Sequence, residues 1–242
     1  MDTRNIAATL TATLELRTKP VALALAEAPP AGVRNFEGTA PSACSFWRHA
    51  ESSVFYATAA QHFHCPVGAM VMGFEMPDEV QAELTGMVGV MVEGGYLGAD
   101  EPPHIPTMPR KSAGVVYGPL EDFPIDPDAI VLWLTPRQAM LMAEAGGAAH
   151  WTGSTPGATL GRPACAAIPS ALARGSVAAS LGCVGMRTYT EVADDHMLAV
   201  VPASAAPQLA GALSNIIVAN RALAEFHEAR KLGEEANRLG AA

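Results

Sequence analysis

The sequence predicts a mixed α+β or α/β fold, in which helices and a mixed sheet form a sandwich. Apolar runs of strand length interleave with amphipathic stretches, but they follow no strict βαβ rhythm. Half of the 242 residues are hydrophobic, 16% are charged and the mean hydropathy is +0.19, which excludes disorder over most of the chain. A chain of this length can bury a full core without disulfides or metals.

The expected strands are short apolar or β-branched runs. They span residues 21–26, 53–59, 129–134, 176–179 and 197–201. The expected helices show apolar residues at helical spacing or carry start signals, such as Thr135 followed by Pro136. They span residues 5–16, 44–50, 77–92, 136–145 and the stretch from 207 onward.

Three further segments are expected to be irregular. Residues 61–68 and 181–187 each contain a cysteine beside glycine or proline, which favours a loop. Residues 94–127 hold seven prolines and little periodicity except at 114–117. This composition suits either a lid-like loop or the seam between two halves of the molecule.

The order of these features repeats weakly along the chain. Each half has a buried apolar strand, then a first cysteine, then a second cysteine followed closely by Val-Gly. The cysteines of the two pairs lie 21 and 18 residues apart. We therefore predict a single domain over residues 1–242, built from two closely packed halves, about 1–112 and 113–220, and followed by a C-terminal helix at 221–239.

Charge and hydropathy limit the classes of partner. The net charge of −9 and the pI near 5.2 argue against a nucleic-acid binder, which needs a basic face. The first twenty residues carry several charges and lack the apolar core of a signal peptide, and no run of about 18 apolar residues is free of charge. We expect a cytoplasmic protein with no membrane partner, in which cysteines are thiols or metal ligands.

Cys44, Cys65, Cys165 and Cys183 are the candidate metal and cofactor ligands. Cys65 lies in His-Cys-Pro-Val-Gly and Cys183 in Gly-Cys-Val-Gly, where glycine lets backbone N–H groups approach the sulfur, as they do around iron–sulfur clusters. The chain has neither a Cys-x2–4-Cys zinc knuckle nor a Cys-x-x-Cys dithiol. Buried structural thiols are the alternative, because cysteine is among the most buried residue types.

Three further side chains are secondary candidates. His62 and His64 precede Cys65 and would share a face in an extended segment, so that they could join a metal site or move protons. Alternatively, one packs in the core and the other is exposed. Arg187 follows the second cysteine block and could bind an anionic substrate, although such an arginine more commonly pairs with a surface carboxylate.

Several blocks together resemble the "domain of unknown function 169" family of uncharacterised, cysteine-bearing prokaryotic proteins. The blocks are LRTKPVA from Leu16, Cys44, the stretch from Val54 to HCPVGA at 64–69, and LGCVGMR from Leu181 with the following DDHML. The resemblance covers roughly residues 8 to 218. It implies cysteines at all four candidate positions, which a shared ligand would explain together. The second glycine common in the first block is replaced by Val67, which leaves the surroundings of that cysteine open.

The leading hypothesis is a cytoplasmic protein that binds one [4Fe–4S] cluster through the four cysteines. Its role would be redox chemistry or electron transfer, with a small molecule or a redox partner. One alternative is a non-catalytic small-ligand or sensor protein with reduced thiols and an apolar pocket of methionine and aromatic residues such as Phe46, Trp47 and Tyr56. Another is a zinc protein with His62 or His64 near the metal. Whether the protein is an enzyme stays open. The charged C-terminal helix suggests a homo-oligomer.

Overall fold

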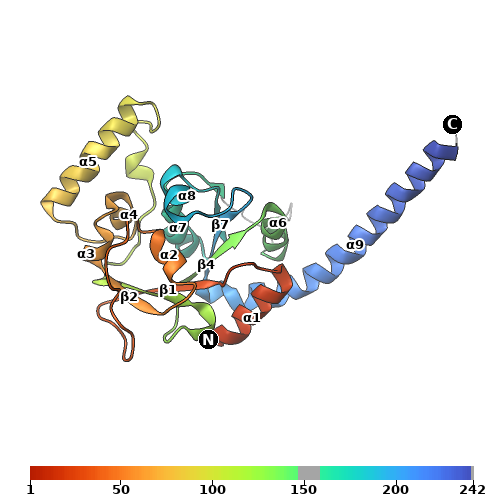
Figure 1. Cartoon of the computed structure of the whole chain (residues 1–242), viewed down its shortest axis with the longest axis horizontal. Helices are drawn as coiled ribbons and strands as arrows, with labels where there is room; N and C mark the ends of the chain where they lie inside the picture. Colours follow the sequence, from red (N-terminus) through yellow and green to blue (C-terminus); the bar gives the residue numbers. More distant parts are fainter. Residues whose placement is uncertain (147–158, 241–242) are drawn as a thin grey trace.

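A single seven-stranded sheet lies at the centre of the computed structural model, which describes residues 1–146 and 159–240 (Figure 1). The strands are β1 Val21–Ala26, β2 Phe55–Thr58, β3 Gly114–Pro119, β4 Ala129–Leu134, β5 Thr159–Leu160, β6 Ala178–Ser180 and β7 Met197–Pro202. They lie in the order β2-β3-β1-β4-β7-β6-β5, with every pair antiparallel except β5 and β6. The predicted mixed α+β class is confirmed.

Helices cover both faces of this sheet. The α-helices are α1 Thr3–Leu14, α2 Ser45–His49, α3 Ala59–His62, α4 Pro66–Val71, α5 Asp78–Glu93, α6 Pro136–Ala145, α7 Ala167–Arg174, α8 Val184–Thr190 and α9 Ala206–Gly240. Short 3-10 helices are η1 Pro102–His104, η2 Leu120–Asp122, η3 Ala164–Ala166 and η4 Ala203–Ala205. The C-terminal helix is thus continuous from Ala206 and does not begin near residue 221.

The prediction of loops at 61–68 and 181–187 is wrong, because short helices begin in both segments. Thr58 and Gln61 form a reciprocal capping box that starts α3, and Pro66 takes the first position of α4, where its missing N–H costs nothing. α8 begins directly after Cys183. Proline and glycine therefore mark helix starts here, not interruptions.

Side chains alternate between the two faces along each central strand, as strand geometry requires. On β1, Val21 and Leu23 join a core with α2, α4 and α7, while Ala22 and Ala24 join a second core with α1, α6 and α9. The first of these cores includes Cys44 and Cys165. One face of the sheet therefore carries the cysteines, and the opposite face serves to anchor the helices at the two ends of the chain.

A similar order of elements recurs on the two sides of the β1–β4 pair, apart from α3, α5 and η1 on one side and α6 and β5 on the other. β1 and β4 each lead to a segment with a first cysteine, then to an outer strand, β2 or β6. A helix that begins directly after a second cysteine follows, α4 or α8, and the chain then returns as β3 or β7, which ends in proline and a 3-10 helix. Because β3 pairs with β1 and β2, the two sides divide after β3, within 120–128, and not near residue 112.

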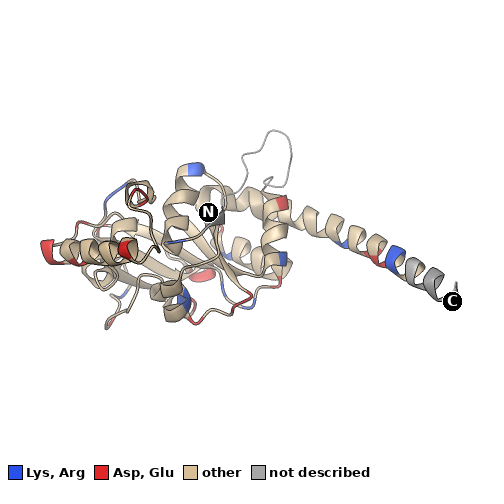
Figure 2. Cartoon of the chain, turned by 90° about the horizontal axis from the view of Figure 1, so that it is seen from above, with Lys and Arg blue, Asp and Glu red and all other residues tan. Residues whose placement is uncertain are grey.

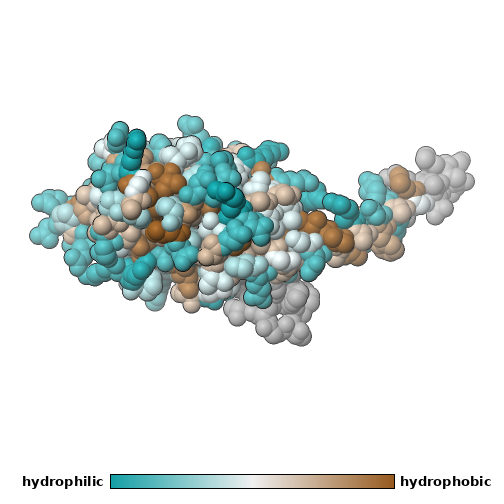
Figure 3. Space-filling model, turned by 90° about the horizontal axis from the view of Figure 1, so that it is seen from below, coloured by the Kyte–Doolittle hydropathy of each residue, from teal (hydrophilic) through white to brown (hydrophobic). Residues whose placement is uncertain are grey.

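The long helix α9 packs on the body of the protein as far as Asn220, whose side chain donates to Glu144 of α6, and then projects from it (Figure 1). Leu209 and Leu213 are buried against α1 and α6, but Val218, Leu223 and Phe226 are at least half exposed. Figure 3 shows both hydrophobic and hydrophilic residues at the surface of the projecting part. Over the part of the chain that the structure describes, no helix is both long enough and apolar enough to cross a membrane.

Candidate functional site

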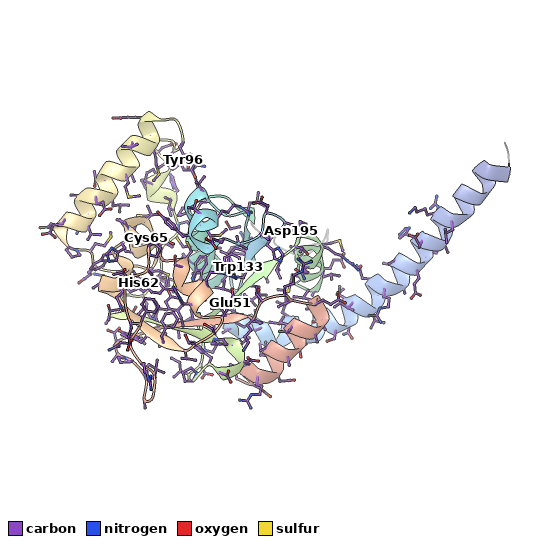
Figure 4. The ribbon with its side chains drawn as sticks, viewed as in Figure 1. Glu51, His62, Cys65, Tyr96, Trp133 and Asp195 are labelled. Carbon is purple, nitrogen blue, oxygen red and sulfur yellow. The ribbon has the colours of Figure 1, made fainter. Side chains whose placement is uncertain are left out.

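All four cysteines line one cavity of about 690 Å³. It is lined by the residues just before α2, by α4 and by residues 162–165, together with α5 and α8. Figure 4 shows Cys65 and Tyr96 on this side of the molecule and His62 nearer to β2. The four cysteines, which lie up to 139 positions apart in the chain, therefore line one cavity.

Each cysteine lies at the beginning of a helix, and the four form two equivalent pairs. Cys44 directly precedes α2 and Cys165 lies in η3 before α7, and both side chains are buried. Cys65 and Cys183 are the N-cap residues of α4 and α8, and both are half-buried. The repeated order of elements thus presents one buried and one half-buried thiol from each side of the sheet.

Within the described part of the chain, Ser42 and Met186 form hydrogen bonds with cysteine sulfur atoms. The Ser42 hydroxyl lies 2.9 Å from the Cys44 Sγ, and the backbone N–H of Met186 donates to the Cys183 Sγ at 3.5 Å. A hydroxyl or amide donor stabilises the thiolate form of cysteine over the thiol. Cys44 and Cys183 therefore each have a neighbouring donor that would stabilise a negatively charged sulfur atom.

Burial opposes that charge at two of the four cysteines. It raises the pKa of Cys44 to about 12, against the smaller opposite effect of the Ser42 hydrogen bond, and nearby Cys65 and Cys183 raise it further. Burial also raises the pKa of Cys165 well above the usual value, with Cys65 as the next contribution. At neutral pH these two groups are thiols unless a cation replaces their protons.

Glycine is needed at two positions beside the cysteines, one because of close packing and one because of its backbone conformation. A Cβ on Gly68 would lie 2.5 Å from the Ala43 Cβ and 3.0 Å from the Cys65 Sγ, so only glycine lets α4 pack this closely beside the thiol. Gly182 has a φ of +92°, a conformation that suits glycine, and it turns the chain into Cys183. The glycines therefore position the two half-buried cysteines.

The histidines lie apart from the cavity lining. His62 ends α3 and is buried beside the rings of Phe46 and Phe74, where its Nδ1–H donates to the Thr58 carbonyl oxygen at 2.8 Å and its Nε2 accepts from the Tyr117 hydroxyl at 3.0 Å. Burial lowers the pKa of His62 to about 4. His64 is exposed. The segment is not extended, so the expected shared face does not form, and the arrangement matches the alternative in which one histidine packs in the core and the other is exposed.

Arg187 supports the backbone near the site and does not line the cavity. Its Nη2 donates to the carbonyl oxygens of Leu181 and His196 at 2.7 and 3.1 Å, and its Nη1 lies 4.0 Å from Asp194. These contacts join α8 to the turn before β7. The aromatic residues expected in an apolar pocket, Phe46, Trp47 and Tyr56, are instead packed in the two cores.

Sequence reasoning missed Arg162, the charged side chain of the cavity lining. Its guanidinium lies 4.4 Å above the Tyr96 ring, donates to the Tyr96 carbonyl oxygen and lies 3.5 Å from the Glu101 carboxylate. Arg162 thereby ties the segment after α5 to the chain just before Cys165. An arginine in a glycine- and proline-rich stretch carries no sequence signal for such a contact.

Within residues 1–146 and 159–240, no three His, Cys, Asp or Glu side chains form a group compact enough for a single metal ion. Four thiolates on one tetrahedral zinc would lie about 3.8 Å apart, given Zn–S bonds of about 2.3 Å. The thiolates of an iron–sulfur cluster bind different iron atoms and stand farther apart.

Fold and site together define a mixed α+β protein with a cavity lined by four cysteines. The sequence profile of DUF169, described as "Uncharacterised ArCR", matches residues 9–212. Because this match covers most of the chain, the protein belongs to the DUF169 family, as its cysteine blocks predicted. No curated protein and no solved structure matches the chain.

Proposed function

We propose that Cys44, Cys65, Cys165 and Cys183 bind one [4Fe–4S] cluster and that the protein has a redox or electron-transfer role. The observation that carries the proposal is the convergence of four thiols from four separate segments on one cavity. Packing alone gives no reason for four thiols to meet in this way, whereas a shared ligand does. When bound, such a cluster supplies one-electron redox chemistry.

The residues at the site fit this group. Cysteine thiolates are the usual ligands of such clusters, and four are present in two equivalent pairs. Because the pKa of Cys44 and of Cys165 is raised, both are protonated at neutral pH, and binding of cationic iron would release their protons. The hydrogen bonds from Ser42 and Met186 then act on charged sulfur, where donors of this kind tune a cluster's reduction potential.

Anaerobic purification with iron and acid-labile sulfide analysis tests the proposal. We expect about four iron and four sulfide per chain and a brown protein whose visible absorption falls on reduction. Cys65→Ser should lower the iron content sharply, while His64→Ala, one residue away on an exposed side chain, should leave it unchanged.

Three outcomes would contradict the cluster. A colourless, iron-free protein after anaerobic reconstitution would leave a thiol protein without a metal. One zinc per chain would favour the zinc alternative. Loss of metal in His64→Ala as severe as in Cys65→Ser would show that the ligand set differs from the four cysteines.

A further inference from the structure

The helix α5 is unusual because its apolar side faces the cavity and not a protein core. Leu84, Met87, Val88 and Met91, at helical spacings of three and four, all line the cavity. None of the sixteen residues of α5 is buried, although a helix of this composition ordinarily hides its apolar stripe. The acidic residues of α5 are Asp78, Glu79, Glu83 and Glu93, and the stretch 84–92 carries no charge (Figure 2).

The other lining residues are also mainly apolar. Met70 of α4 and Val184, Met186 and Tyr189 of α8 line the cavity together with the cysteines. Val184 and Tyr189 are 71% and 48% exposed, so the cavity reaches the surface at this side. Its volume of about 690 Å³ and its mainly apolar lining match the size and character of small-molecule sites in proteins.

The charged side chains at the cavity indicate whether a molecule that binds there is anionic, cationic or neutral. Among its described lining residues, Arg162 is the one with a charged side chain, and Glu101 and the Tyr96 ring already offset that charge. An anionic ligand would have to displace Glu101, and a cationic ligand would meet no free carboxylate on the walls. A neutral ligand needs neither change.

We infer that the space beneath α5 is a binding site for an uncharged, mainly apolar organic molecule, held directly against the four cysteines. Its apolar part would contact the apolar side chains of α5 that line the cavity and are not buried in a core. The contacts of Arg162 with Tyr96 and Glu101 hold the segment after α5 over the site. The site is argued from its apolar walls, so it does not require iron at the cysteines. A cluster bound there would fill part of the same cavity, and the molecule would then lie against the cluster.

Two substitutions of the same kind on α5 test the site. Val88→Phe places a larger side chain in the cavity, whereas Val90→Phe places it on the outer side of the helix, where Val90 is 71% exposed and does not line the cavity. The probe is the neutral dye Nile red, titrated by fluorescence into the anaerobically purified full chain, with circular dichroism and thermal melting to verify folding. The anionic dye anilinonaphthalene sulfonate is titrated in parallel.

The expected result is saturable binding of one Nile red per chain. Val88→Phe should weaken it by about tenfold or more, the effect of one misfitting hydrophobic group, and Val90→Phe should leave it within about twofold. Equal affinities of the two folded variants, no saturable binding, or tighter binding of the anionic dye would each overturn the inference. Iron content is measured on the same samples, so failure of dye binding and failure of the cluster proposal are read separately.

Discussion

His62 should make the stability of the protein depend on pH in a defined window. The side chain is 1% exposed, and its pKa falls from 6.5 to about 4 because burial penalises the charged ring, while the Thr58 hydrogen bond opposes the shift only in part. Between these two values the unfolded chain binds a proton at His62 that the folded chain does not. The contribution of His62 to the free energy of unfolding is therefore fully present above about pH 6.5 and is lost as the pH falls toward 4.

The size of the effect follows from the shift. One pKa unit corresponds to about 1.4 kcal/mol, so the lowered pKa of His62 implies a loss of about 3 kcal/mol across the window. His62→Gln removes the titration and keeps an amide that can donate to the Thr58 carbonyl oxygen and accept from the Tyr117 hydroxyl. The variant should be less stable than the wild type at pH 7, because the ring packing against Phe46 and Phe74 is lost.

Urea unfolding followed by tryptophan fluorescence, from pH 7 down to pH 4, measures this effect. The difference in free energy of unfolding between the wild type and His62→Gln should shrink by about 3 kcal/mol over that range. His64→Gln, the same change on an exposed ring two positions away, should follow the wild-type profile. Parallel profiles for the wild type and His62→Gln would refute the reasoning, because a buried neutral histidine cannot leave the pH dependence unchanged.

Two further predictions follow from contacts elsewhere. Gly68→Ala should cost about 1–3 kcal/mol in urea unfolding and lower the iron content, because its Cβ would lie 2.5 Å from the Ala43 Cβ and 3.0 Å from the Cys65 Sγ. Gly89→Ala, with open space around its Cβ, should instead stabilise the protein by up to about 1 kcal/mol. If both variants change stability and iron equally, close packing at Gly68 is not the cause. Self-association through the exposed side of α9 predicts a mass above 25.1 kDa in light scattering, which Phe226→Glu should reduce to that of one chain. A monomeric wild type would contradict it.

Local sequence signals predicted the elements whose formation depends on adjacent residues. The unbroken apolar runs at 21–26 and 129–134 are β1 and β4, with the same bounds. Thr135 caps α6 and Gln138 completes its capping box, so the start of this helix follows from four consecutive residues. Such signals need no distant partner, because a cap or an apolar run acts over a few positions.

Elements that depend on distant partners were not predictable in the same way. β3 lies in a proline-rich segment, and its place between β1 and β2 is a matter of backbone pairing with residues far along the chain. The stripe of α5 predicts a helix with one apolar side, but a periodic pattern is the same whether that side meets a core or a cavity. The contacts of Arg162 likewise depend on where two separate segments meet.

The sequence by itself determined the α+β class, the family and the four cysteines as candidate ligands, because composition, short apolar runs and residue types are local properties. Only the tertiary structure decided that the four thiols share one cavity, that His62 belongs to the core, and that α5 faces open space. Those facts arise from strand order and from the packing of helices on one face of the sheet. Both bring together residues more than a hundred positions apart, which no local pattern can encode.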